Sequence, residues 1–218
     1  MTAPPVLVLT GGMGAGKSSA CNAFRSLGIA IVDADEIAHR VTASGGRAIP
    51  GILSIFGSQL LQEDGALNRD AMRSLAFKDP EALRQLEGIV HPLVRDEARL
   101  ELARAQGPYV VYAVPLWVET QGSQRPDWVW RVVVIDLPED LQRARVLARQ
   151  PIAQDTLDGM LARQATRAQR LAAADIVLSN NGTPDDLRAA VRELHRSLLA
   201  CLDQRSPPQA ASEPGIRP

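Results

Sequence analysis

Five short apolar stretches recur along the chain, and helix-compatible sequence fills most of the space between them. The apolar stretches cover residues 6–10, 29–32, 109–114, 131–136 and 176–178. The run Val-Val-Val-Ile within the fourth stretch has no alternation of apolar and polar positions. Such composition is typical of a strand buried on both faces, because a half-exposed strand alternates. We therefore predict five strands in a sheet that is covered on both sides.

Helical segments separate these strands. One is expected over 18–27, ending at Gly28, and another runs from a cap at Thr183, with Pro184 in its first turn, to about Leu202. Strands that alternate with helices are typical of an α/β fold with a parallel sheet. The fold class predicted here is therefore a parallel five-stranded sheet flanked by helices.

The segment between the second and third strands, residues 34–105, is helical over most of its length. Gly45-Gly46, Gly57 and Asp79-Pro80 interrupt the pattern, and we expect about two or three helices. Because this is too much chain for a simple crossover, we interpret it as an inserted helical substrate lobe.

A glycine-rich run with the pattern G-x-x-x-x-G-K-[ST] occupies residues 11–18, between the first strand and the first helix. Its lysine, Lys17, is one of only two lysines among the 24 Lys and Arg residues of the chain. Backbone N–H groups of such a loop curl around a phosphate, the lysine reaches phosphate oxygens, and the Ser18 hydroxyl binds the accompanying Mg²⁺. The alternative is a glycine-rich turn without a ligand. The predicted ATP-binding residues are Gly12, Gly14, Ala15, Gly16, Lys17, Ser18 and Ser19.

Two carboxylates follow the second strand, in the order Asp33-Ala34-Asp35. Ligands of open α/β sheets gather at the carboxyl ends of the strands, so Asp33 and the phosphate-binding loop should face one another. Asp33 could accept a proton from an attacking hydroxyl or orient Mg²⁺ through its waters, or it could only cap the helix that follows. Asp35 could contact a substrate hydroxyl or the helix dipole. The third strand ends without an aspartate, which favours a small-molecule kinase over motor ATPases and GTPases.

Composition limits the remaining function classes. The formal net charge of −1 argues against a general nucleic-acid-binding surface, and no apolar run has transmembrane length. With only two cysteines, no metal-ligand spacing and no signal peptide, we expect a cytoplasmic protein, monomeric or weakly homo-oligomeric, with no membrane or nucleic-acid partner. Residues 1–203 are expected to form one domain and 204–218 a disordered tail.

Several short motifs in order along the chain resemble the dephospho-coenzyme A kinase family of P-loop kinases, whose fold is similar to that of nucleoside monophosphate kinases. The resemblance spans about residues 6–202. Its motifs are Thr10-Gly11-Gly12-Met13-Gly14-Ala15-Gly16-Lys17-Ser18, Asp33-Ala34-Asp35, His91-Pro92, Val114-Pro115-Leu116 with Glu119, Arg149, Gln164-Ala165-Thr166-Arg167, Ala174-Asp175 and Asn180-Asn181-Gly182.

This resemblance implies ATP- and Mg²⁺-dependent phosphorylation of the ribose 3′-hydroxyl of dephospho-CoA, the last step of coenzyme A biosynthesis. It implies that Asp33 is the general base beside Lys17. It also implies a lid over about 145–165 that carries Arg149 onto the phosphates, and an acceptor lobe over about 34–105. Gln150-Pro151 departs from the family pattern, so Arg145 and Arg163 remain rivals of Arg149.

Asp35, His91 and Glu119 are the candidate acceptor contacts. His91 could instead be a hydrogen-bonded histidine at a proline kink, and Glu119 an ordinary surface residue. Two further hypotheses stay open. One is a kinase of a smaller hydroxylated acceptor such as a nucleoside, gluconate or shikimate, and the other is a nucleotide-sensing adaptor without transfer activity.

Overall fold

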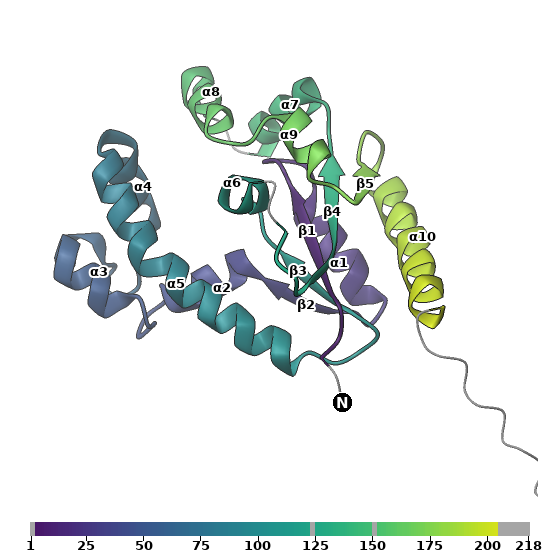
Figure 1. Cartoon of the computed structure of the whole chain (residues 1–218). Helices are drawn as coiled ribbons and strands as arrows, with labels where there is room; N and C mark the ends of the chain where they lie inside the picture. Colours follow the sequence, from purple (N-terminus) through teal and green to yellow (C-terminus); the bar gives the residue numbers. More distant parts are fainter. Residues whose placement is uncertain (1–2, 123–124, 150–151, 205–218) are drawn as a thin grey trace, which may run out of the picture.

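A five-stranded parallel sheet lies at the centre of the computed structural model, which describes residues 3–122, 125–149 and 152–204 (Figure 1). The strands lie in the order β2-β3-β1-β4-β5, and every neighbouring pair is parallel. This confirms the predicted fold class, with strand ends shifted by one or two residues. The strands are β1 (Val6–Gly11), β2 (Ala30–Asp33), β3 (Val110–Ala113), β4 (Val129–Asp136) and β5 (Ile176–Ser179).

Helices cover both faces of this sheet. On one face lie α1 (Lys17–Ser26) and α10 (Pro184–Asp203), which pack with Leu7 and Leu9 of β1 into one buried cluster. The intervening Val8 contributes to a different cluster, because successive side chains of a strand point to opposite faces. The absence of apolar–polar alternation in the strands is thus explained by burial on both sides.

Four α-helices and a short 3₁₀ turn form the helical insertion, residues 34–104, between β2 and β3. The expectation of about two or three helices is therefore wrong. Each of the three predicted breaks lies between two helices. Asp79 caps α5 by accepting hydrogen bonds from the backbone N–H groups of Glu81 and Ala82. The elements are α2 (Ala34–Val41), α3 (Ile49–Phe56), η1 (Ser58–Leu60), α4 (Arg69–Lys78) and α5 (Pro80–Arg104).

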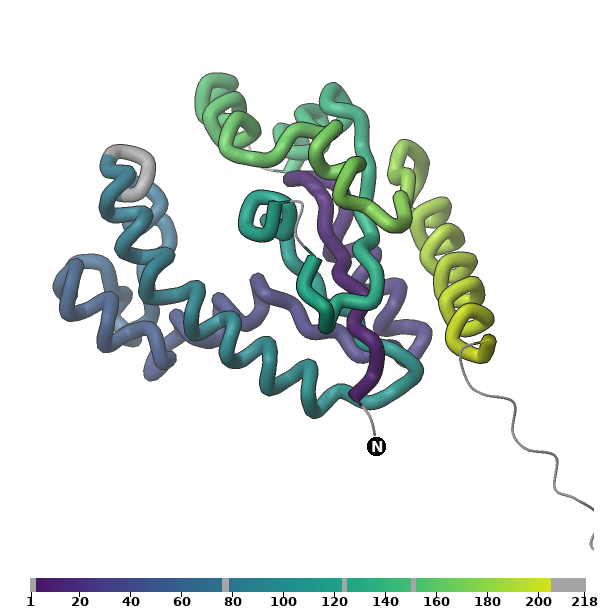
Figure 2. The backbone as a smooth tube through the Cα atoms, in the orientation of Figure 1, coloured from purple at the N-terminus to yellow at the C-terminus, as the bar shows by residue number. Residues whose placement is uncertain are grey.

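Between β3 and β5 the described residues form four more helices. They are α6 (Trp117–Gln121), α7 (Glu139–Arg149), α8 (Gln154–Ala162) and α9 (Arg167–Ala172). The backbone trace shows the helical insertion and α8 projecting from the same end of the sheet (Figure 2). No helix in the described part of the chain combines the length and the apolar character that crossing a membrane requires.

Two sequence predictions fall on residues that lie outside the described ranges. Gln150-Pro151 is one, and residues 205–218, nearly all of the predicted tail, are the other. Gln204, the first residue of that predicted tail, is the C-cap of α10.

Candidate active site

The glycine-rich loop leads from the carboxyl end of β1 into α1, whose first helical residue is Lys17. Gly16 adopts a left-handed conformation, with φ 98°, and an added Cβ there would collide with Asn180 Nδ2. At Gly12 the same addition would lie 2.7 Å from Gln142 Nε2. The left-handed φ at Gly16 therefore disfavours any side chain there, whereas at Gly12 the ends of the Gln142 and Arg170 side chains would have to move. Backbone N–H groups at the start of a helix such as α1 can bind an anion.

Lys17 joins this loop to the carboxylates that follow β2. Its Nζ lies 2.9 Å from Asp35 Oδ2 and 3.6 Å from Asp33 Oδ2. Burial alone would lower the pKa of Lys17, but the charges of Asp35 and Asp33 outweigh burial and raise the pKa above its ordinary value. The lysine therefore stays cationic at neutral pH. The sequence-based expectation that Asp33 faces the loop is met.

Asp33 uses its two carboxylate oxygens differently. Oδ1 accepts a hydrogen bond of 2.9 Å from the backbone N–H of Asp35 and caps α2, whereas Oδ2 faces Lys17. The side chain is buried, with 7% of the residue exposed. The cap and the reactive role are therefore not alternatives, because each needs a different oxygen.

Cys21 lies on the buried side of α1 and is not a reactive residue of the site. Burial, followed by the charge of Asp33, raises the pKa of its thiol to about 11. At neutral pH the residue is thus a protonated, packed side chain.

Three buried or half-buried polar side chains contact the loop. Asn180 Nδ2 donates a hydrogen bond of 2.7 Å to the carbonyl oxygen of Ala15. Gln164 Oε1 accepts one of 3.1 Å from the N–H of Met13. The guanidinium of Arg170, a residue only 7% exposed, packs against Gly12. Sequence reasoning assigned no role to these side chains, although Asn180 and Gln164 lie within quoted motifs.

The oxygen donors at the site fit Mg²⁺ that arrives with a nucleotide. Among the described residues, no group of three or more His, Cys, Asp or Glu side chains could hold a metal ion alone. Ser18, exposed in the first turn of α1, and Asp33 offer one hydroxyl and one carboxylate at the end of the sheet where the loop lies. Because Mg²⁺ is usually held by few protein ligands plus phosphates and water, this small set suffices.

Comparison with known proteins decides the family. A family model described as dephospho-CoA kinase matches residues 5–186. The chain belongs to the dephospho-CoA kinase family. A dephospho-CoA kinase of Aromatoleum aromaticum is 46% identical to it over 192 residues, which cover 88% of this chain and 93% of the relative.

Solved structures share this fold. A crystal structure of a Thermus thermophilus protein matches with a TM-score of 0.72 and 28% identity, covering 90% of this chain and 99% of that one. A dephospho-CoA kinase from Campylobacter jejuni matches with a TM-score of 0.64 and 22% identity, covering 90% and 98%. At that identity the second match supports the fold alone.

In this dephospho-CoA kinase family member, the three arginines considered as phosphate contacts of the lid lie in different places. Arg145 donates hydrogen bonds to the carbonyl oxygens of Asn180, at 2.9 Å, and Gly182, at 3.3 Å. Arg149 is exposed at the last position of α7, one turn beyond Arg145 on the same helix face. Arg163 follows α8 and lines the cleft beside the helical insertion.

The three candidate acceptor contacts also have different surroundings. Asp35 is brought to Lys17, as described above. Glu119 Oε1 accepts a hydrogen bond of 2.7 Å from the N–H of Ala165, so it links α6 to the segment before α9. His91 is exposed on α5, and its imidazole forms no hydrogen bond with another described residue. The interpretation of His91 as a hydrogen-bonded histidine is therefore not supported, although α5 does continue through Pro92.

Two residues near Asp33 and Asp35 were missed by sequence reasoning. Tyr112 of β3 is half-buried; burial raises its pKa, and the charges of Arg95 and Asp33 act on it as well. Arg69 at the start of α4 is influenced by the charge of Asp35. Arg69 could not be singled out from sequence, because arginine is the ordinary cation throughout this chain.

Proposed function

We propose that this chain transfers the γ-phosphoryl group of ATP to the ribose 3′-hydroxyl of dephospho-CoA and so produces coenzyme A and ADP. One observation carries the proposal. Lys17 of the phosphate-binding loop and Asp33 after β2 lie within 3.6 Å of each other at the carboxyl edge of the sheet. A phosphate-binding cation is thus placed beside a carboxylate that can act on an acceptor hydroxyl.

Lys17 and the loop bind the donor in this proposal. The N–H groups at the start of α1 and the Lys17 ammonium surround the β- and γ-phosphates, where negative charge accumulates during transfer. Ser18 would hold Mg²⁺, which neutralises charge on the phosphate oxygens when bound. Because Lys17 pairs with Asp35 and Asp33 in the ligand-free protein, phosphate oxygens replace part of these ion pairs on binding.

Asp33 acts on the acceptor. As the 3′-oxygen forms a bond to the γ-phosphorus, the bond from that phosphorus to the β–γ bridging oxygen breaks and ADP leaves. The hydroxyl proton passes to Asp33 Oδ2, the oxygen that is not engaged in capping α2. The cap fixes the carboxylate through its other oxygen, so the base is oriented before the substrate arrives.

Arg149 is the proposed lid arginine. Gln142 and Val146 of α7 both approach glycines of the loop, and Arg149 lies on the same helix face. Arg145 is already held by two carbonyl groups, whereas Arg149 is exposed and forms no ion pair with a described residue. Arg149 is therefore the arginine of α7 that remains available for the phosphates.

The helical insertion is the proposed acceptor lobe, and residues from about 145 to 165 are the proposed lid. Closure of the lid would exclude water, which otherwise competes with the ribose hydroxyl for ATP. Since ATP is a cytoplasmic metabolite, the proposed reaction places the chain in the cytoplasm.

The test is a coupled assay of ADP production by the purified protein with ATP, Mg²⁺ and dephospho-CoA, with the product identified by mass. We expect turnover with dephospho-CoA and little with shikimate, gluconate or nucleosides offered as alternative acceptors. Lys17→Ala serves as the background. Turnover of dephospho-CoA no faster than this background would contradict the proposal.

A further inference from the structure

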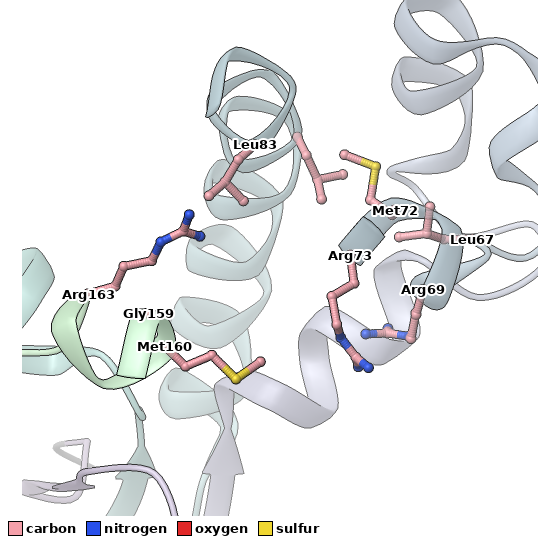
Figure 3. Close-up of a pocket in the computed structure, with 9 residues that line it drawn as sticks. Leu67, Arg69, Met72, Arg73, Leu83, Gly159, Met160 and Arg163 are labelled. Atoms are coloured by element: carbon pink, nitrogen blue, oxygen red, sulfur yellow. The ribbon is translucent and has the colours of Figure 1, made fainter. Parts of the chain in front are cut away.

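A cleft of about 340 Å³ separates the helical insertion from α8, next to the site described above (Figure 3). Arginines line it from both sides, with Arg69 and Arg73 on α4 and Arg163 just after α8. Its apolar lining includes Met72, Leu83 and Met160. No acidic residue is among the described residues that line it. The cleft thus combines concentrated positive charge with apolar surface.

Arg69 is held in place without being neutralised. Its guanidinium donates a hydrogen bond of 2.6 Å to Thr42 Oγ1, and Thr42 is buried. Burial and the neighbouring charge of Arg73 lower the pKa of Arg69, while the charge of Asp35 opposes this. No described carboxylate lies within ion-pair distance of Arg69. Two adjacent cations, one of them partly desolvated, form a site that an anion would stabilise.

The other two arginines are also available to a ligand. Arg73 pairs at 3.4 Å with Asp70 on its own helix, and both side chains are mostly exposed, so this pair is weak. Arg163 forms no ion pair with a described residue. In Figure 3 the heads of Arg69 and Arg73 lie together, and Arg163 approaches from the α8 side towards Leu83.

Arg69 connects the cleft to the candidate active site through α2. Arg69 reaches the carbonyl oxygen of Ala38, at 3.4 Å, and Asp33 caps the same helix five residues earlier. At the rise of an α-helix this separation is about 7.5 Å along the axis. A group attached to the ribose through its 5′-carbon can therefore reach Arg69 while the 3′-hydroxyl of the same ribose lies at Asp33.

We propose that this cleft binds the diphosphate of the acceptor, with Arg69 and Arg73 on the lobe side and Arg163 on the lid side. The inference rests on the proposed function, because dephospho-CoA carries its diphosphate on the ribose 5′-oxygen. The aliphatic part of its pantetheine arm lies against Met72, Leu83 and Met160. Arg163 is then an acceptor-binding residue and no longer a rival of Arg149.

The test compares Arg73→Gln with Arg84→Gln. Both arginines are exposed and pair with an acidic residue three positions earlier, but Arg84 is not among the residues that line the cleft. Losing one charge-assisted contact should raise the KM for dephospho-CoA about tenfold in Arg73→Gln, while kcat and the KM for ATP stay within about twofold of the original values. Arg84→Gln should change none of these. Arg73→Lys should restore part of the affinity.

Adenosine provides the second arm, since it has the base and the ribose of the acceptor but no diphosphate. Its inhibition constant against dephospho-CoA should be the same for the original protein, Arg73→Gln and Arg69→Gln. The proposal is overturned if both variants keep the original KM for dephospho-CoA, or if the inhibition constant of adenosine rises by the same factor as that KM.

Calorimetric binding of dephospho-CoA without ATP separates this proposal from the proposed function. If the original protein shows no turnover, the proposed function fails, and binding that is unaffected in Arg73→Gln and Arg69→Gln also overturns the diphosphate site. If the original protein is active and the variants match it, only the diphosphate site fails.

Discussion

The phosphate-binding loop and the cleft beside α8 differ in how the protein satisfies its own charges. At the loop, Lys17 has two carboxylate partners, and Asn180 hydrogen-bonds the Ala15 carbonyl in the interior. In the cleft, Arg69 and Arg163 have no carboxylate partner among the described residues. The loop is therefore preorganised by contacts within the protein, whereas the cleft needs a ligand to balance its charge. We infer a rigid donor side and an acceptor side that is completed by its substrate.

Removing the loop cation should have the largest effect. Lys17→Ala deletes the charge nearest the transferred phosphoryl group, and kcat should fall about 1,000-fold in the coupled ADP assay. Lys17→Arg is the matched control. Because a planar guanidinium replaces a compact ammonium poorly, Lys17→Arg should remain severely impaired. Near-normal turnover of Lys17→Ala would show that the loop is not the donor site.

The proposed lid arginine should rank second. Arg149→Gln should lower kcat about 100-fold if Arg149 contacts charge that develops during transfer. Arg145→Gln, one turn earlier, removes hydrogen bonds to the carbonyl groups of Asn180 and Gly182 and should mainly lower the melting temperature. If Arg145→Gln loses activity and Arg149→Gln does not, the two roles are reversed.

A smaller effect is expected on stability, where variants of the loop and of the cleft should differ in the free energy of unfolding. Asn180→Ala leaves the buried carbonyl of Ala15 without its partner, at a cost of about 1–3 kcal/mol in the free energy of unfolding. Arg73→Gln, in the cleft, should change that free energy by less than about 0.5 kcal/mol because the side chain is exposed. Denaturant titration of both variants measures the contrast. Equal losses of stability would remove the distinction between a preorganised loop and an unfilled cleft.

The strands, the phosphate-binding loop and Asp33 could be predicted from short stretches of sequence. The strands could be predicted from apolar runs. The loop could be predicted from its glycines, because some of these positions need a backbone conformation or a close contact that other residues do not allow, as at Gly16. Asp33 could be predicted because the carboxyl ends of parallel strands share one edge of the sheet. The number of helices in the insertion was underestimated because each break, including Gly57, separates two helices.

The rest depends on contacts between distant parts of the chain. Asn180 is 165 residues from its partner Ala15, and Gln164 is 151 residues from Met13. Arg69 is one of many arginines until the fold places it beside Asp35 and Arg73. No periodicity or spacing in the sequence records such pairings. The side chains that support the loop and line the cleft could therefore be recognised only in the folded protein.

The kinetics of Asp33→Asn test the central claim most directly. Asparagine caps a helix about as well as aspartate, so the melting temperature and the KM for ATP should stay close to the original values. An amide cannot accept the hydroxyl proton, so kcat with dephospho-CoA should fall about 1,000-fold. A kcat within about twofold of the original would contradict the account and leave Asp33 only its role as the cap of α2.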